Sequence, residues 1–459
     1  MGTVIVNGTL VTASETFSAE LRMEDGRIAA VGHNLARPGD EVVDAGGLLV
    51  LPGGVDVHTH LDLPSMGTVA SDDFETGTIA AVFGGTTSII DFVTPAKGKS
   101  LTESLELWRK KAEGRSVIDY GLHMSVTEMA GDTLEQMDEV FEQGVTSFKV
   151  FTAYPGVLML DDAAILRALR WAARRGALIQ VHAENGLAIA ELVASLAAEG
   201  KLEPRYHAES RPSVLEGEAT ARVLALAEVA GAPVYIVHLT CREALEAVRA
   251  ARARGVRAFA ETCPQYLYLS DEELARPDFE GAKFVCSPPL RDRSHAPALW
   301  QGLALGDLQV VATDHCPFNF KGQKEAGRGD FRKIPNGLPG IETRLTLVHQ
   351  GVVEGKLSMN RFVDAVATAP AKMFGLHPRK GVLAPGADAD VVIWDPHKRV
   401  DLSASRLHMR VDYSIYEGKV VTGGPAKVFV GGRLTVDGDR FLGKAGDGRF
   451  LRRRAFVAP

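Results

Sequence analysis

Short apolar runs alternate with amphipathic stretches through the middle of the chain, a pattern typical of alternating β-strands and helices. The apolar runs have the length of buried strands, and eight occur, at residues 55–60, 86–93, 119–126, 146–153, 178–184, 234–240, 257–262 and 308–314. Helical patterns separate them, at residues 72–83, 102–113, 133–143, 161–175, 214–229, 242–254 and 296–303. Asp161 and Ser213 are predicted N-caps, and Gly144, Gly176 and Gly255 stand where C-caps belong.

Eight strand–helix units predict an α/β fold of the (β/α)8 TIM-like barrel type rather than an open doubly wound sheet. No Gly-x-Gly-x-x-Gly motif follows the first strand, which weakens the alternative of a dinucleotide-binding domain. The chain of 459 residues suits one barrel with a small appendage.

Both ends of the chain are rich in short β-like runs and poor in helix. Asn7-Gly8 and Asp25-Gly26 are predicted hairpin turns. Near the other end, β-runs are expected at residues 389–394, 411–416, 419–422, 426–430 and 434–436. Neither end has enough apolar surface for an independent domain. We therefore expect residues 1–52 and 376–459 to form one small β-sandwich and its tail, beside a barrel of residues 53–375.

Composition and charge narrow the class of protein. The net charge of −7 arises from 51 basic and 58 acidic residues that are well mixed along the chain, which argues against binding of nucleic acid. The one basic run, residues 452–454, is expected to be a solvated tail. No apolar run reaches the ~18 residues that cross a bilayer, and no secretory signal is apparent at the start. Four scattered cysteines indicate reduced thiols, so we expect a cytoplasmic protein without membrane attachment.

Potential metal ligands stand at the ends of five predicted strands. His58 and His60 are two residues apart, so in a strand both side chains face the same side. A lone His-x-His pair is more often structural than metal-binding. In this chain, however, candidate ligands recur at the ends of five predicted strands. Barrels of this type place their active sites at the carboxyl ends of the strands. The pattern predicts one metal centre, built from His58, His60, Lys149, His182, His238 and Asp314.

The number and type of these residues suggest two ions rather than one. Four histidines and one aspartate exceed the three protein ligands that a catalytic ion usually has. Two ions need a bridging anion, and the fourth strand offers Lys149, which carbon dioxide could convert into an anionic carbamate. An ordinary ion-pairing lysine and hydrogen-bonded core histidines remain the alternatives. The predicted chemistry is metal-assisted hydrolysis, in which Asp314 accepts a proton from water and passes it to the departing nitrogen.

Nine motifs spread over nearly the whole chain carry a resemblance to a known family. They are GVDVHTHLD at 54–62, FKVF at 148–151, VHAENG at 181–186, VHL at 237–239, ETCPQYL at 261–267, CSPPLR at 286–291, TDHCPF at 313–318, KIPNGLPGIE at 333–342 and APAKMFGL at 369–376. With these motifs the chain resembles the cyclic amidohydrolases, and within them the D-hydantoinase/dihydropyrimidinase group.

The resemblance implies hydrolysis of the cyclic amide bond of 5-substituted hydantoins, dihydropyrimidines or both, giving N-carbamoyl amino acids with D-selectivity. It implies two zinc ions bridged by carboxylated Lys149. One ion would be held by His58, His60 and Asp314, and the other by His182 and His238. It also implies that Tyr154 is an oxyanion donor, that Ser287 and Asn336 contact the amide groups of the ring through backbone atoms, and that the protein is a homotetramer. A phenol suits the role given to Tyr154, because it can stabilise a developing oxyanion.

Related families remain as alternatives. Dihydroorotases act on a substrate with a carboxylate and carry an arginine two residues after the His-x-His pair, where this chain has Asp62. Allantoinases are less similar around residues 148–154 and 286–291. The collapsin-response mediator proteins share the fold but have lost metal ligands, whereas this chain fills all six ligand positions. The sequence leaves the choice between hydantoins and dihydropyrimidines open.

One departure from the family concerns a substrate lid. Many D-hydantoinases have a phenylalanine in the loop after the first histidines, where this chain has Ser65. The resemblance implies a lid over the 5-substituent of the ring, formed here by Leu63, Ser65, Met66, Phe151 and Leu158. With Ser65 and the adaptable Met66 in it, we expect tolerance of bulky alkyl substituents.

Overall fold

An eight-stranded parallel sheet forms the centre of the protein, and the computed structural model describes residues 2–457. Thr59 at the end of the first strand bridges His315 just beyond the last, so the sheet nearly closes on itself. This confirms the predicted barrel, and each predicted apolar run contains one strand. In chain order the strands are β8 (Gly54–Thr59), β11 (Thr86–Val93), β12 (Asp119–Ser125), β13 (Ser147–Phe151), β14 (Leu178–His182), β15 (Val234–Ile236), β16 (Ala258–Thr262) and β17 (Val310–Val311).

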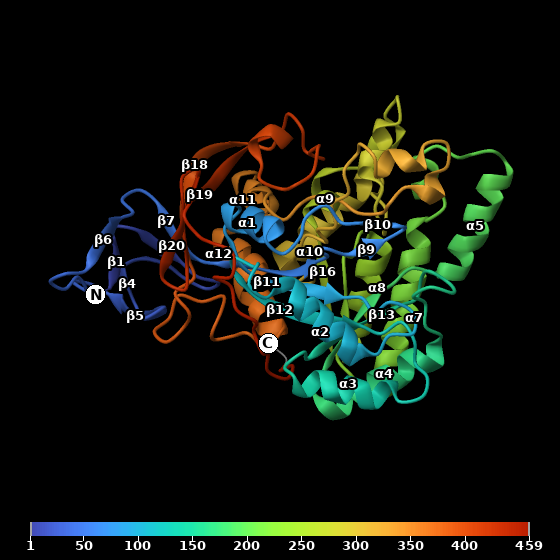
Figure 1. Cartoon of the computed structure of the whole chain (residues 1–459), viewed down its shortest axis with the longest axis horizontal. Helices are drawn as coiled ribbons and strands as arrows, with labels where there is room; N and C mark the ends of the chain where they lie inside the picture. The colour runs from blue at the N-terminus through green and yellow to red at the C-terminus, as the bar shows by residue number, and fades with distance from the viewer. Residues whose placement is uncertain (1, 458–459) are drawn as a thin grey trace.

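Helices surround the barrel, and all seven predicted ones are present: α1 (Thr76–Phe83), α2 (Leu101–Ala112), α3 (Thr133–Glu142), α4 (Asp162–Arg175), α7 (Ser213–Ala230), α8 (Arg242–Ala253) and α10 (Ala296–Leu305) (Figure 1). Asp161 caps α4 by accepting from the Ala164 amide, and Gly176 ends the helix in the left-handed conformation. The predicted cap at Ser213 is wrong. Pro212 holds the N-cap position and Ser213 is already helical, because the extended φ and ψ of a cap suit a proline there.

Further helices lie in the connections and had no clear periodic pattern: α5 (Gly186–Ala198), α6 (Tyr206–Glu209), α9 (Pro264–Tyr268), α11 (Arg344–Val353), α12 (Met359–Val363) and α13 (Ala369–Met373). Helix α5 follows the end of β14 directly and lies at the end of the molecule remote from the N-terminus (Figure 1). None of the helices in residues 2–457 combines the length and apolar composition needed to cross a bilayer.

Strands from both termini form the second part of the molecule, as predicted. One sheet has the order β5 (Arg27–Gly32), β4 (Glu20–Glu24), β1 (Thr3–Val6), β6 (Glu41–Asp44). The other has the order β21 (Arg440–Phe441), β20 (Arg433–Asp437), β19 (Val420–Val430), β18 (Val391–Asp401), β7 (Leu49–Pro52), β2 (Thr9–Val11), β3 (Thr16–Ser18). Their facing side chains share an apolar core that includes Ile5, Leu21, Val50 and Ile393.

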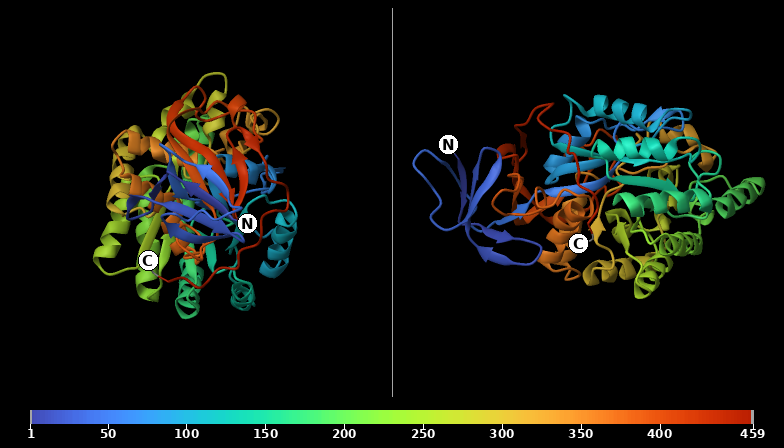
Figure 2. Two further views of the ribbon diagram at one scale, coloured as in Figure 1. Left: turned by 90° about the vertical axis from the view of Figure 1, so that its left-hand side faces the viewer. Right: turned by 90° about the horizontal axis from the view of Figure 1, so that it is seen from below.

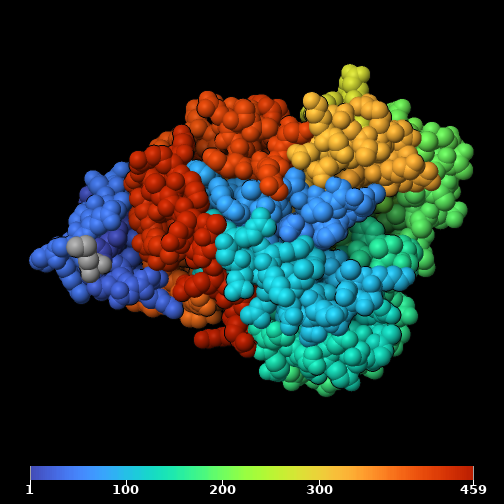
Figure 3. All heavy atoms as spheres, viewed as in Figure 1, coloured from blue at the N-terminus to red at the C-terminus, as the bar shows by residue number. Residues whose placement is uncertain are grey.

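The antiparallel pairing of β7 with β18 joins the two ends of the chain. Figures 2 and 3 show the N-terminal strands in blue beside the C-terminal strands in red, at one end of the molecule. A single residue, Gly53, separates the last N-terminal strand β7 from the first barrel strand β8. The exact division into 1–52, 53–375 and 376–459 stays a prediction.

Two details of the predicted sandwich are wrong. The Asn7-Gly8 turn does not form a hairpin, because β1 pairs with β4 and β6 in one sheet while β2 pairs with β3 and β7 in the other. Residues 411–416 form no strand; Tyr413 and Tyr416 are instead buried against the barrel core. The Asp25-Gly26 hairpin between β4 and β5 is confirmed.

The C-terminal segment does not end as a solvated tail. Arg449 and Leu451 bond to Tyr120, and the Arg453 amide donates to Gly144 O, so the segment runs along the barrel. The Arg453 side chain is buried and donates to Ser147 Oγ and Leu122 O. The expectation of a solvated basic run is therefore wrong for Arg453, which the pattern of three arginines could not distinguish from its exposed neighbours.

Candidate metal centre

The six predicted metal ligands lie together at the carboxyl end of the barrel. His58, Lys149 and His182 belong to β8, β13 and β14, while His60, His238 and Asp314 lie one, two and three residues beyond β8, β15 and β17. Parallel strands bring these ends to the same rim of the barrel. His238 and Asp314 adopt left-handed backbone angles, with φ of 39° and 53°. Such strained conformations are typical of functional sites, where the surroundings hold them.

The polar atoms of this cluster are within coordination reach of one another. Asp314 Oδ1 lies 3.2 Å from both His58 Nε2 and His60 Nε2. Lys149 Nζ lies 3.0 Å from His58 Nε2, and His182 Nδ1 lies 2.9 Å from His238 Nε2. Histidine, aspartate and an anionic lysine carbamate are a donor set that suits zinc. His58, His238 and Asp314 alone already have the mutual distances of a group that could hold a metal ion.

Buried carboxylates outside the cluster orient two of the histidines. His58 Nδ1 donates to Glu261, and His182 Nε2 donates to Glu184 over 2.7 Å. The other ring nitrogen of each histidine then has no proton and presents a lone pair to the centre of the cluster. The arrangement therefore fits a metal centre better than a hydrogen-bonded histidine core.

Burial keeps the cluster poor in protons. It holds the pKa of His58 and the pKa of His238 well below the ordinary histidine value, so both rings are neutral at pH 7. Burial also lowers the pKa of Lys149 to about 8. Phe92 contributes to this burial, since its ring packs against His58 and lies 4.3 Å from Lys149 Nζ. A neutral imidazole is the form that binds a metal ion, and a neutral amine is the form that reacts with carbon dioxide.

A cavity of about 860 Å³ opens over the cluster. Its wall includes His60, Lys149, His182, His238 and Asp314, and the predicted substrate contacts Tyr154, Ser287 and Asn336. All five predicted lid residues line it as well: Leu63, Ser65, Met66, Phe151 and Leu158. Asn336 Nδ2 donates to Ser287 Oγ over 3.2 Å, which ties the two loops together. The structure thus brings together every residue that the sequence proposed for the site, with buried His58 just behind the wall.

Tyr154 stands beside the cluster, with its ring centroid 5.2 Å from that of His182. Burial, reinforced by the negative charge of Glu184, raises the pKa of the Tyr154 phenol. The hydroxyl therefore keeps its proton at neutral pH and can act as a hydrogen-bond donor.

The sequence reasoning did not assign Glu261, Glu184 or Arg211 to the site. Glu261 lies one residue before the end of the seventh apolar run, as His58 lies two residues before the end of the first, so its position in the pattern could have identified it. Glu184 lies two residues after His182 and points the same way. Arg211 lies in the connection between α6 and α7, and no pattern in the sequence could have placed it on the cavity wall.

Comparisons with known proteins agree with this geometry. The model of the amidohydrolase family matches residues 49–435. The chain is 52% identical to a D-hydantoinase of Streptomyces coelicolor, over 98% of each protein, and 50% identical to a D-hydantoinase of Geobacillus stearothermophilus, over 100% of this chain and 98% of that protein. Among solved structures it is similar to a dihydropyrimidinase from Brevibacillus agri, with a TM-score of 0.99, 48% identity and full coverage of both chains. The chain belongs to the amidohydrolase family, and within it to the D-hydantoinase/dihydropyrimidinase group.

Proposed function

We propose that this protein is a metal-dependent hydrolase that opens the cyclic amide bond of 5-substituted hydantoins, dihydropyrimidines or both. The observation that carries the proposal is the convergence of six ligand-type side chains at one cavity, five of them in its wall and buried His58 behind it. The names of relatives that are about 50% identical over their full length support the substrate class and D-selectivity.

Two zinc ions are the proposed cofactors. His58, His60 and Asp314 would hold one ion, His182 and His238 the other, and carboxylated Lys149 would bridge them. The lone pairs that Glu261 and Glu184 direct inward support this assignment. The lowered pKa of Lys149 supports carboxylation, because only the neutral amine can attack carbon dioxide. The chemistry that such ions supply is activation of a water molecule and polarisation of a carbonyl group.

The remaining roles follow from the positions of side chains around the cavity. Asp314 is the proposed proton carrier, taking a proton from water and delivering it to the departing ring nitrogen. The protonated Tyr154 hydroxyl would donate to the oxygen of the ring carbonyl as negative charge develops there. Ser287 and Asn336 would bind the amide groups of the ring through backbone atoms, held in register by their mutual hydrogen bond.

The proposal is tested by steady-state kinetics on protein of measured metal content. We expect about two zinc ions per chain and hydrolysis of dihydrouracil and of a panel of 5-substituted hydantoins. Comparison of kcat/KM across the panel decides which substrate class is preferred. Protein that holds stoichiometric zinc but hydrolyses neither class would refute the proposal, as would full activity after complete removal of metal.

Assembly and location complete the proposal. We infer a homotetramer, from the resemblance to hydantoinases, and light scattering after size-exclusion chromatography measures it directly. All four cysteines are buried and free, which supports a reducing cytoplasmic location. No nucleic acid or membrane partner is proposed.

A further inference from the structure

Arg211 is a cation on the cavity wall that has no part in the reaction as proposed so far. Two other cations of the wall have a carboxylate beside them: Lys99 lies 3.8 Å from Glu103, and Arg332 lies 2.7 Å from Asp330. Within residues 2–457, no carboxylate oxygen lies within 4.0 Å of a nitrogen of the Arg211 guanidinium. An arginine stays charged at all physiological pH values, so the cavity contains one guanidinium without a directly paired carboxylate, although its charge acts on nearby Glu184.

The surrounding residues hold Arg211 in a fixed position. Its Nη1 donates to Ser210 Oγ over 2.8 Å and to His207 O over 3.2 Å. Buried His207 donates its Nε2 proton to Cys286 O over 2.7 Å, so its Nδ1 is free to accept from Arg211 Nη1 at 3.3 Å. The Nε and Nη2 groups of Arg211 make no hydrogen bond to any described residue. The side chain is therefore anchored at one nitrogen and presents its remaining donors.

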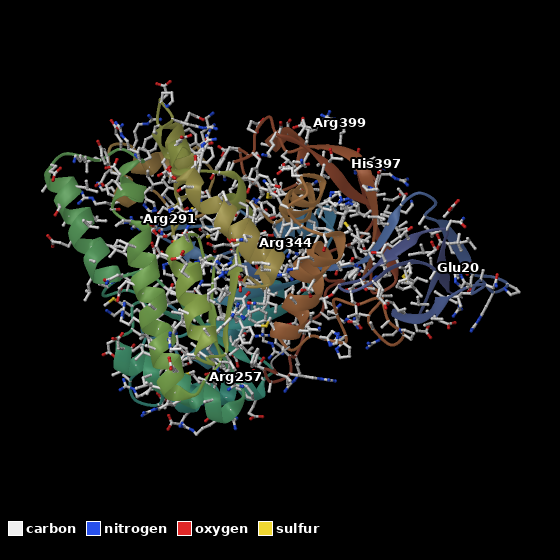
Figure 4. All side chains as sticks on the ribbon, turned by 180° about the vertical axis from the view of Figure 1, so that it is seen from behind. Glu20, Arg257, Arg291, Arg344, His397 and Arg399 are labelled. Carbon is white, nitrogen blue, oxygen red and sulfur yellow. The ribbon has the colours of Figure 1, made fainter. Side chains whose placement is uncertain are left out.

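The backbone at this position is anchored as well. The Arg211 carbonyl accepts a hydrogen bond from Arg291, which is itself buried and pairs with Glu216 over 2.7 Å. Figure 4 labels Arg291 in the barrel part of the molecule. Anchored donors of this kind bind an anion at a smaller entropic cost than a mobile side chain would.

The proposed reaction creates the kind of group that Arg211 would bind. Water adds its oxygen to the ring carbonyl carbon and the bond from that carbon to the ring nitrogen breaks. The nitrogen takes one proton, the new carboxylic acid releases another to solvent, and a carboxylate remains. The substrate ring is neutral, whereas the open-chain product is an anion. A guanidinium with free donors matches a carboxylate in both charge and geometry.

We propose that Arg211 is a product-recognition residue, which binds the carboxylate formed when the ring opens. This inference rests on the proposed function. A recess of about 180 Å³, bordered by Tyr154, Arg211 and Glu184, adjoins this side of the cavity and offers room for the longer open-chain molecule. Glu184 would repel a carboxylate in the recess, so the carboxylate belongs on the cavity side of Arg211. Arg211 thereby distinguishes product from substrate and slows product release.

The test compares product inhibition in two variants of the zinc-loaded enzyme. Arg211→Gln removes the charge and leaves a shorter polar side chain. Arg332→Gln is the matched control, since Arg332 lines the same cavity but is paired with Asp330. The inhibition constant Ki of N-carbamoyl-D-alanine is measured against hydantoin hydrolysis. We expect Arg211→Gln to raise the ratio of Ki to the KM of hydantoin by about tenfold or more, the range of a charged hydrogen bond. Arg332→Gln should leave the ratio at its wild-type value.

A second inhibitor isolates the charge. The carboxamide of N-carbamoyl-D-alanine is neutral, so its Ki should not rise relative to KM in Arg211→Gln. An equal rise for both inhibitors, or an unchanged ratio for the carboxylate, would overturn the inference. If Arg211→Gln does not fold, Arg211→Met removes the charge instead, and an unchanged ratio of Ki to KM in that variant would equally overturn the inference. A wild-type enzyme that opens neither hydantoins nor dihydropyrimidines would instead refute the proposed function.

Discussion

At the scale of single residues, the carboxylates behind the cluster decide what its histidines can do. Glu261 accepts from His58, from Tyr235 OH at 2.9 Å and from the His238 amide at 3.2 Å. It therefore fixes the tautomer of one proposed ligand and the backbone of another.

Glu261→Gln should weaken metal binding by about 10–100-fold, because loss of such a partner releases the orientation of the ligand. The amide oxygen can still accept a hydrogen bond from His58, but the amide nitrogen can also donate one and so allow the wrong tautomer. Competition with a chelator measures the affinity. Tyr235→Phe is the control, since it removes a contact of Glu261 while leaving the His58 contact intact. Wild-type affinity in Glu261→Gln would show that the carboxylate has no such role.

Lys149→Ala should lose most of the bound zinc and nearly all activity, because no other described side chain can supply the bridging anion. The Lys149 side chain is buried beside Phe92, so its removal leaves a space that short carboxylic acids could enter. We expect such acids to restore part of the activity. Metal analysis and kinetics with and without acetate test this, and an alanine variant with two metals per chain and full activity would disprove the carbamate.

Tyr154→Phe should lower kcat by about 10²–10³-fold, the usual effect of removing one oxyanion donor. The KM should change much less, because the hydrogen bond strengthens mainly in the transition state. Steady-state kinetics with hydantoin separates the two constants. A variant in which only KM changes would mean that Tyr154 binds the ground state.

The sequence could identify the six proposed ligands because each stands at the end of an apolar strand, and a barrel brings all such ends together. The partners of these ligands were harder to find. Glu184 and Glu261 also lie at the ends of strands, but they bond to histidines instead of standing among the proposed ligands, and their sequence positions do not reveal that difference. Arg211 reaches the cavity from a helix connection, and only the three-dimensional path of that connection brings it there.

At the scale of elements, buried parallel strands were predictable because they are continuous apolar runs between helical patterns. The Asn7-Gly8 turn misled for a physical reason: a turn dipeptide reverses or redirects the chain locally, but here β1 and β2 continue into different sheets. Residues 411–416 misled because their apolar side chains are buried without forming a strand. A local apolar pattern predicts that a side chain is buried, but it does not predict which strand or helix packs against it.

The proposed lid over the cavity includes a small β-hairpin. Strands β9 (Pro64–Ser65) and β10 (Thr68–Val69) form a hairpin whose turn contains Met66 and Gly67, both with positive φ. Leu63, Ser65 and Met66 line the cavity, and Met66 is 52% exposed. A short hydroxyl at Ser65 leaves more space than an aromatic ring would.

Ser65→Phe should narrow the range of accepted 5-substituents while dihydrouracil hydrolysis stays nearly unchanged, because dihydrouracil has no substituent to reach the lid. Chiral chromatography of the N-carbamoyl products from racemic hydantoins measures both range and selectivity, and we expect predominantly D-product from the wild-type enzyme. Predominantly L-product, or no response to substitutions at Ser65 and Met66, would refute the assignment of the lid.

At the scale of the whole molecule, the two termini converge on the barrel from different directions. The N-terminal strands continue into it through β7 and Gly53, and Asn360 Nδ2 in α12 also donates to Thr12 O beyond β2. The C-terminal segment passes from the sandwich back along the barrel, as far as Phe456, whose amide donates to Gly176 O. Buried Arg344, labelled in Figure 4, donates to Val55 O and Val311 O and so joins the first and last barrel strands. These long-range contacts leave no local signal in the sequence.

A buried ion cluster connects the barrel to the sandwich. Lys380 Nζ lies 2.7 Å from Asp119 on β12, 2.7 Å from Asp390 and 3.0 Å from Asp388 just before β18. The carboxyl groups are nearly as buried as the amine. Asp388 also pairs with Arg379 over 2.8 Å, so Lys380 matters most for the charges of Asp119 and Asp390. Burial opposes ionisation of Asp119, but the Lys380 charge outweighs it and holds the pKa of Asp119 below the ordinary value.

Lys380→Met should therefore lower the free energy of unfolding by about 3–5 kcal/mol at pH 7, as expected when one member of a buried ion pair is removed. Without the cation, the pKa values of the folded carboxyl groups rise above their unfolded values. The stability penalty is then largest above these raised pKa values and shrinks as the pH falls through them toward ~4, where the carboxyl groups are protonated in both states. Urea unfolding at pH 7 and pH 5 measures the difference. Lys427→Met, which removes a partly exposed partner of Asp437, is the control and should cost about 1 kcal/mol or less. Equal losses in the two variants, or a Lys380→Met penalty that grows toward acid pH, would contradict the view that this cluster joins the sandwich to the barrel.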